Sequence, residues 1–140
     1  MPKSLNWERN WSVAAHLAAV LGILSVAPLW KQGLYLGIPL LNLLIPYLLW
    51  MKGRNFGFFI DHHACESLNF QLTITLFAAL VIFLAWTASG WLDGVRSVAL
   101  LTLVGLFLFN AAMAIWAAVR TYDRQTFTYP LSFQFVKTMH

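Results

Sequence analysis

The chain has 140 residues, of which 60% are hydrophobic and only 10% are charged. Soluble proteins contain about 25% charged residues, so this composition excludes an ordinary water-soluble domain and favours lipid as the solvent. The length permits a single domain. The formal net charge of +4 does not indicate nucleic-acid binding, because the basic residues are spread over chain ends and loops. The one cysteine, Cys65, cannot form an internal disulfide.

Four apolar runs are long enough to cross a hydrocarbon core, which needs about 17–25 helical residues. In the third run, the part expected to span the core starts at Leu68, and the turns from His62 onward are expected in the headgroup region. The sequence therefore predicts an all-α integral membrane protein, a four-transmembrane-helix bundle with an extended cytoplasmic C-terminal tail over residues 120–140. The predicted spans are Trp11–Trp30, Leu34–Met51, His62–Trp86 and Val95–Val119.

The distribution of Lys and Arg predicts the orientation. The N-terminus, the second loop and the tail together carry seven of these residues, and the other side carries only Lys31 and Arg96. Short cytoplasmic loops are enriched in Lys and Arg. We therefore expect a multi-pass protein of the bacterial inner membrane with both termini in the cytoplasm.

The second predicted helix carries Pro39, Asn42 and Pro46 on one face. Each proline removes a backbone hydrogen bond and frees a carbonyl group. In lipid such carbonyls need partners, so this face is expected to look into the bundle or onto water. Proline-interrupted helices occur both in transport sites and in ordinary helix packing, and both interpretations remain open.

Small residues recur at four-residue spacing in the first and last helices, which allows close helix packing within a bundle or in a dimer. His16 is expected to be a buried, neutral, hydrogen-bonded side chain, and Asn110 an interhelical hydrogen-bonding residue. The small-residue series are Ala14, Ala18 and Gly22, and Asn110, Ala114 and Ala118.

The segment FIDHHACESLNFQ, residues 59–71, contains the one dense cluster of ionisable groups in the sequence. Ionisable groups at the mouth of a membrane helix are costly, so the cluster is a candidate functional site. Asp61 is placed as an N-cap. Helical spacing puts one polar stripe on a single face, made of His62, Glu66, Asn69 and Thr73. The candidate residues of the cluster are Asp61, His62, His63, Glu66, Asn69 and Gln71.

Three interpretations of the cluster compete. A metal could use His62 and Glu66 with another histidine, but one helix supplies too few ligands. A haem could be held by two of the histidines at positions 16, 62 and 63, although nothing else indicates a porphyrin pocket. The favoured interpretation is structural, with Glu66 and Asn69 bonded to the first and fourth helices. We predict no catalytic residue, no metal and no cofactor.

Two aromatic segments flank the cluster in the predicted fold. In the loop Lys52–Ile60, Phe56, Phe58 and Phe59 are expected at the acyl boundary, with the basic residues among headgroups. The tail segment Thr126–Val136 alternates between apolar and polar residues, which is typical of an extended strand, and Pro130 makes it an edge or unpaired segment. Its apolar face is expected to pack on the bundle or to pair with a partner. That face consists of Phe127, Tyr129, Leu131, Phe133 and Phe135.

The segments FIDHHACESLNFQ and TFTYPLSFQFVK resemble the two characteristic motifs of a family of small bacterial four-helix membrane proteins of unassigned function. This family is distantly similar to Tic-twenty, a subunit of the chloroplast inner-envelope import translocon. The resemblance implies a role in protein translocation, and its register favours His63 over His62. The family pattern corresponds to Asp61, His63, Glu66, Leu68, Asn69, Phe70 and Gln71.

The sequence thus predicts a non-enzymatic integral membrane subunit or accessory protein of a larger inner-membrane assembly. The alternative is a component of protein translocation or small-molecule transport. The expected partners are the lipid bilayer and either another membrane protein or further copies of the chain, with no nucleic acid.

Overall fold

The computed structural model describes residues 3–24, 38–88 and 94–139, and contains no strand in these ranges. A non-helical tail follows the last helix. The all-helical fold class predicted from the sequence is therefore confirmed. The helices are α1 (Lys3–Leu24), α2 (Ile38–Gly53), α3 (Phe58–Ala88) and α4 (Val95–Tyr122).

The third helix begins earlier than its composition indicated. Gly57 adopts a φ of 134°, a conformation that favours glycine, and α3 starts at the next residue. Asp61 therefore lies in the first turn and is not an N-cap, and its amide already donates to the Gly57 carbonyl at 3.1 Å. The expected interfacial loop shrinks to a short turn. The predicted parts of the first two spans between residues 25 and 37 lie outside the described residues.

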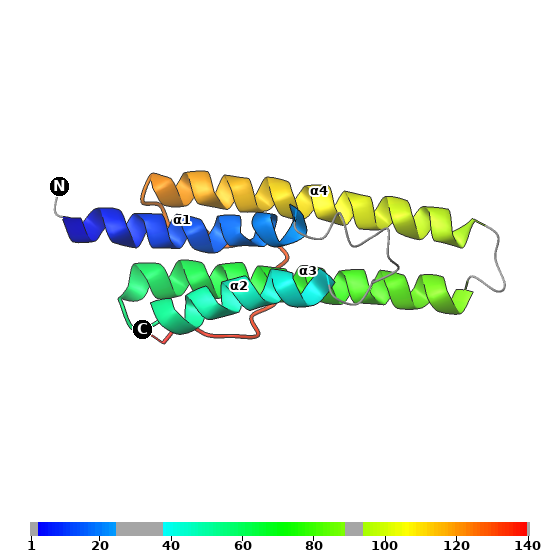
Figure 1. Cartoon of the computed structure of the whole chain (residues 1–140), viewed down its shortest axis with the longest axis horizontal. Helices are drawn as coiled ribbons and strands as arrows, with labels where there is room; N and C mark the ends of the chain where they lie inside the picture. Colours follow the sequence, from blue (N-terminus) through cyan, green and yellow to red (C-terminus); the bar gives the residue numbers. More distant parts are fainter. Residues whose placement is uncertain (1–2, 25–37, 89–93, 140) are drawn as a thin grey trace.

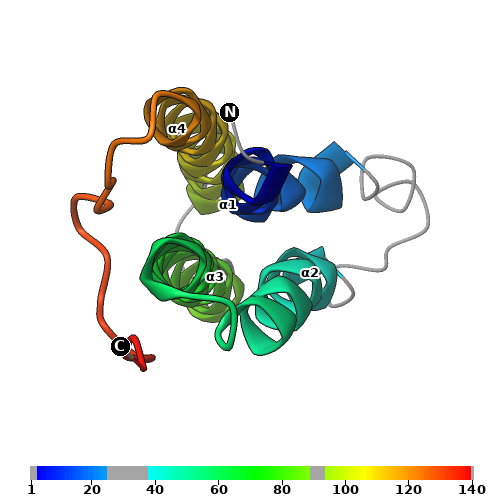
Figure 2. The same cartoon turned by 90° about the vertical axis from the view of Figure 1, so that its left-hand side faces the viewer.

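The helices form two layers, with α1 beside α4 and α2 beside α3 (Figure 1). Helix α1 also contacts α3, whereas no contact joins α2 to α4 among the described residues. Viewed end-on, the tail leaves α4 and runs along the outer side of α3 (Figure 2). The part of α3 that carries the polar cluster thus has α1, α4 and the tail as neighbours.

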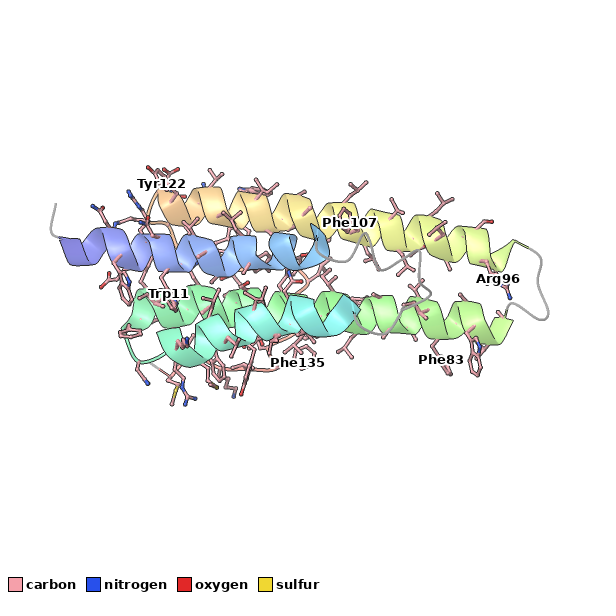
Figure 3. The ribbon with its side chains drawn as sticks, in the orientation of Figure 1. Trp11, Phe83, Arg96, Phe107, Tyr122 and Phe135 are labelled. Carbon is pink, nitrogen blue, oxygen red and sulfur yellow. The ribbon has the colours of Figure 1, made fainter. Side chains whose placement is uncertain are left out.

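Helices α3 and α4 are long and apolar enough to cross a membrane. They have 31 and 28 residues, and their most apolar windows have mean hydropathies of 2.1 and 2.3. Their distal halves, which are the C-terminal half of α3 and the N-terminal half of α4, expose large apolar side chains. Phe83 and Arg96 mark this end of the molecule, opposite the end that carries Trp11 and Tyr122 (Figure 3). The exposed residues on the distal half of α3 include Leu76, Phe77, Leu80, Phe83, Leu84 and Trp86.

Close packing at Gly53 gives a first testable prediction. A Cβ atom at this position would lie 2.7 Å from Ile60 Cγ2 and 2.8 Å from Trp11 Nε1. We expect Gly53→Ala to lower the free energy of unfolding by about 1–3 kcal/mol through overpacking. Chemical denaturation in detergent measures the effect. Gly105→Ala is the control, since a Cβ there meets nothing within 4 Å; equal behaviour of the two variants would contradict the prediction.

Candidate functional site

A chain of buried polar side chains connects three helices and the tail. The phenol oxygen of Tyr129 lies 2.8 Å from Nδ1 of His16, and Nε2 of His16 lies 3.0 Å from Nδ1 of His63. The same His63 nitrogen lies 3.2 Å from the Thr121 hydroxyl. All four side chains are buried. Since buried polar groups are stable only when bonded, this chain fixes the tail to α1, α3 and α4.

The hydroxyl of Tyr129 forms one end of this chain of hydrogen bonds. Burial, and then the negative charge of Glu66, raise the pKa of Tyr129, so its hydroxyl stays protonated. One assignment consistent with a protonated phenol has Tyr129 donating to His16 Nδ1 and His16 Nε2 donating to His63 Nδ1. In this assignment the proton of His63 is on Nε2, which has no partner among the described residues.

Further buried polar contacts join α3 to its helical neighbours. The Ser67 hydroxyl donates to the Ala15 carbonyl at 2.7 Å. Gln71 and Asn110 exchange two hydrogen bonds between their side-chain amides, of 2.8 and 3.2 Å. Asn110 thus acts between helices, as its position in an apolar helix had indicated. These contacts occupy the side of α3 that faces α1 and α4.

A second face of α3 holds the backbone of the tail, and Asn69 is its central residue. Oδ1 of Asn69 accepts the amides of Phe135 and Val136 at 3.0 and 2.8 Å. Its Nδ2 donates to the Val136 carbonyl at 2.8 Å. The side chain is 1% exposed. One carboxamide therefore satisfies three backbone groups, in the way a neighbouring strand would.

Four other side chains extend this arrangement along the helix, and we call the set with Asn69 the tail ladder. Glu66 accepts the Tyr129 amide at 3.2 Å, and Thr73 accepts the Phe133 amide at 3.0 Å. Asp61 accepts the Met139 amide at 2.6 Å, and the Cys65 thiol donates to the Val136 carbonyl at 3.1 Å. The ladder consists of Asp61, Cys65, Glu66, Asn69 and Thr73.

These contacts correct two expectations from the sequence. Glu66 and Asn69 bond the tail, not the first and fourth helices, because the tail crosses the face that they share. The five alternating apolar residues of the tail are not buried together either. Tyr129 is 3% exposed and Phe127 is half-buried, whereas Leu131, Phe133 and Phe135 are exposed. Because the ladder binds backbone groups, the tail can dock without burying that face.

The two adjacent histidines have separate roles. His63 points into the core, as the family register had favoured. His62 lies with Glu66 and Asn69 beside a groove of about 350 Å³ between α3 and the tail. Nε2 of His62 and Oδ1 of Asp61 are buried without a partner among the described residues.

The remaining candidates lie apart from this site. Pro46 is fully buried within α2. Pro39 and Asn42 belong to the same helix, but their side chains fall outside the described residues. Pro130 is exposed at the turn of the tail. Thr121 was not singled out from the sequence, because a threonine near the end of an apolar helix carries no distinguishing pattern.

Metal-ligand geometry can be tested on the same residues. Among the described side chains, no group of three or more His, Cys, Asp and Glu could hold a metal ion. The carboxylates Asp61 and Glu66 accept amides of the tail. The arrangement is suited to holding a polypeptide segment in place.

Comparison with known proteins identifies the family. Residues 7–136 match the magnetosome magnetite crystal formation protein family. No curated protein and no solved structure matches the chain. The match runs from Trp7 in α1 to Val136 in the ladder-bound tail. It agrees with the expected small bacterial membrane-associated family and gives no sign of the likeness to Tic-twenty. The chain belongs to the magnetosome magnetite crystal formation protein family.

Proposed function

We propose that this chain is a non-enzymatic, membrane-embedded accessory protein that acts in magnetite crystal formation. The observation that carries the proposal is the family match, because it spans the helices, the polar cluster and the tail together. The use of the polar side chains also supports an accessory role. The ladder carboxylates and Asn69 bond the tail, so these groups have a structural role: they determine how the tail lies on the surface of the protein.

We further propose that all four helices form a membrane bundle with both termini on the cytoplasmic side. Helices α3 and α4 have the length and hydropathy of spans, and the Lys and Arg distribution supports this orientation. Single cysteines at positions 4 and 138 should react with an impermeant thiol reagent only in inside-out vesicles. Reaction in right-side-out vesicles would refute the orientation.

The transport alternative needs an open polar path along the second helix or along the stripe of Glu66 and Asn69. The tail covers that stripe, and Pro46 is buried. No observation on the described residues therefore favours transport or protein translocation over the accessory role, and the likeness to Tic-twenty gains no support from the comparisons.

A deletion and complementation experiment in a magnetite-forming bacterium that encodes this chain tests the proposal. We expect deletion to change the number or dimensions of the magnetite crystals seen by electron microscopy. Wild-type protein and Asn55→Ala, a change in an exposed turn residue, should restore them. Asn69→Ala, which removes three bonds to the tail, should not. Unchanged crystals in the deletion strain would overturn the proposal.

A further inference from the structure

The tip of the tail, which we define as Leu131–Phe135, combines a fixed backbone with exposed apolar side chains. Leu131 is 80% exposed, Phe133 58% and Phe135 50%. The amides of Phe133 and Phe135 are nevertheless held by Thr73 and Asn69. A loose tail could turn these side chains inward, but the ladder holds them in an outward orientation.

The backbone at Leu131, in the turn with Pro130, adopts a conformation that is costly for leucine. Its φ is 63°, in the left-handed region that branched and bulky side chains rarely adopt. The other non-glycine residue with a positive φ in the described part of the chain is Arg124, at 60°. It lies two positions after α4, where its amide and the next one bond the last carbonyls of the helix. Leu131 does not end a helix and lies in the turn with Pro130. A glycine or asparagine would fit the turn at lower cost, so the leucine side chain itself is the feature that needs an explanation.

The position of the tip indicates what surrounds it. The ring of Phe133 lies 6.4 Å from the ring of Phe77, where the buried polar half of α3 gives way to its exposed apolar half. Phe135 also lies on the same side of the molecule as the exposed Phe83 (Figure 3). If α3 crosses a bilayer, the tip is therefore level with the start of the lipid-facing surface.

The charge pattern of the tail also fits a position at the surface of a bilayer. Residues 126–136 contain no charged side chain, and Lys137 follows immediately and is exposed. An uncharged, aromatic-rich segment beside a cation is typical of chains that lie in the membrane interface, where the cation attracts anionic headgroups. Lys52 at the end of α2 is also exposed, and Val136 lines an apolar groove together with Tyr47 and Trp50 of α2.

We propose that the tip is a lipid-contacting wedge, in which Leu131, Phe133 and Phe135 enter the acyl boundary of the bilayer beside α3. The wedge rests on the proposed membrane embedding of α3. In this arrangement the ladder fixes the depth and direction of the wedge, and the exposed aromatic residues need no protein partner.

Spin labels on single cysteines test the wedge in nanodiscs that contain an anionic phospholipid and the full chain. Cys65→Ser provides the background, because serine keeps a donor for the Val136 carbonyl. Labels are placed at Leu131→Cys, at Thr126→Cys as an exposed tail control, and at Phe83→Cys as a reference for lipid exposure. The readout is relaxation by oxygen, which concentrates in lipid, and by a water-soluble nickel chelate.

We expect the ratio of oxygen to nickel accessibility at position 131 to match that at position 83 and to exceed that at position 126 several-fold. High nickel accessibility at 131 with a lipid signature at 83 would overturn the wedge alone. High nickel accessibility at 83 would overturn the proposed embedding. Low accessibility to both reagents at 131 also overturns the wedge, and dipolar broadening lost on dilution with unlabelled protein would then assign the tip to contact with a second copy.

Discussion

Asn69→Ala is expected to release the end of the tail while the helices stay folded. The substitution leaves the amides of Phe135 and Val136 without their buried acceptor, and the Val136 carbonyl keeps only the weak Cys65 thiol donor. Each unsatisfied group costs about 1–3 kcal/mol, so detachment of the segment into solvent becomes the less costly state. Hydrogen exchange of residues 133–137 should accelerate by about 10- to 100-fold, with little change in α1 and α4.

Two variants separate this effect from general destabilisation. Asn55→Ala replaces the same residue type in an exposed turn and should leave tail exchange unchanged. Asn69→Asp keeps an acceptor for both amides but loses the donor to Val136, so its effect should be intermediate if the new carboxylate stays bonded. Unchanged exchange of residues 133–137 in Asn69→Ala would show that the ladder does not hold the tail.

His16→Ala is expected to cause the largest loss of global stability. The side chain is fully buried and stands between Tyr129 and His63. Its removal creates a cavity and leaves the Tyr129 hydroxyl without its hydrogen-bond partner, which together cost about 3 kcal/mol or more. Thermal unfolding of the purified protein in detergent, followed by circular dichroism, measures the loss as a lower midpoint.

Two substitutions at neighbouring positions serve as comparisons for His16→Ala. His62→Ala removes a partly exposed ring at the groove and should cost less than about 1 kcal/mol. Tyr129→Phe removes only the hydroxyl, so it isolates the hydrogen bond to His16 from the packing of the ring on Phe70, whose centroid lies 4.1 Å away. A His16→Ala midpoint equal to that of His62→Ala would mean that the buried chain contributes no stability.

Periodicity and composition predicted the helices because each apolar run is long and contains strong local signals. The polar stripe of His62, Glu66 and Asn69 was also visible, since helical spacing alone places these residues on one face. What the stripe binds could not be derived. Its partners are backbone amides of the tail, which every residue except proline carries, so no side-chain pattern in the sequence marks them.

The tail shows a different limit of prediction from sequence, because its pattern was visible but its burial was not. Its alternating pattern was real, but period-two alternation only states which side chains share a face, and not whether that face is buried. The exposure of the apolar face of the tail depends on Asn69 and Thr73. These side chains bind main-chain groups and leave Phe133 and Phe135 exposed. The start of α3 was misplaced for a similar reason, because the aromatic residues Phe58 and Phe59 fit an interfacial loop as well as a first helical turn.

The order of chain synthesis has a consequence for the polar face of α3. Ser67 and His63 bond to α1, which is made first, so these contacts can form as α3 emerges. The ladder residues precede their tail partners by up to 78 positions, an interval of about 4–15 s at usual elongation rates. Until the last residues leave the ribosome, Glu66 and Asn69 must stay hydrated. A chain interrupted before Tyr129 would therefore keep its helices and leave these two side chains uncovered.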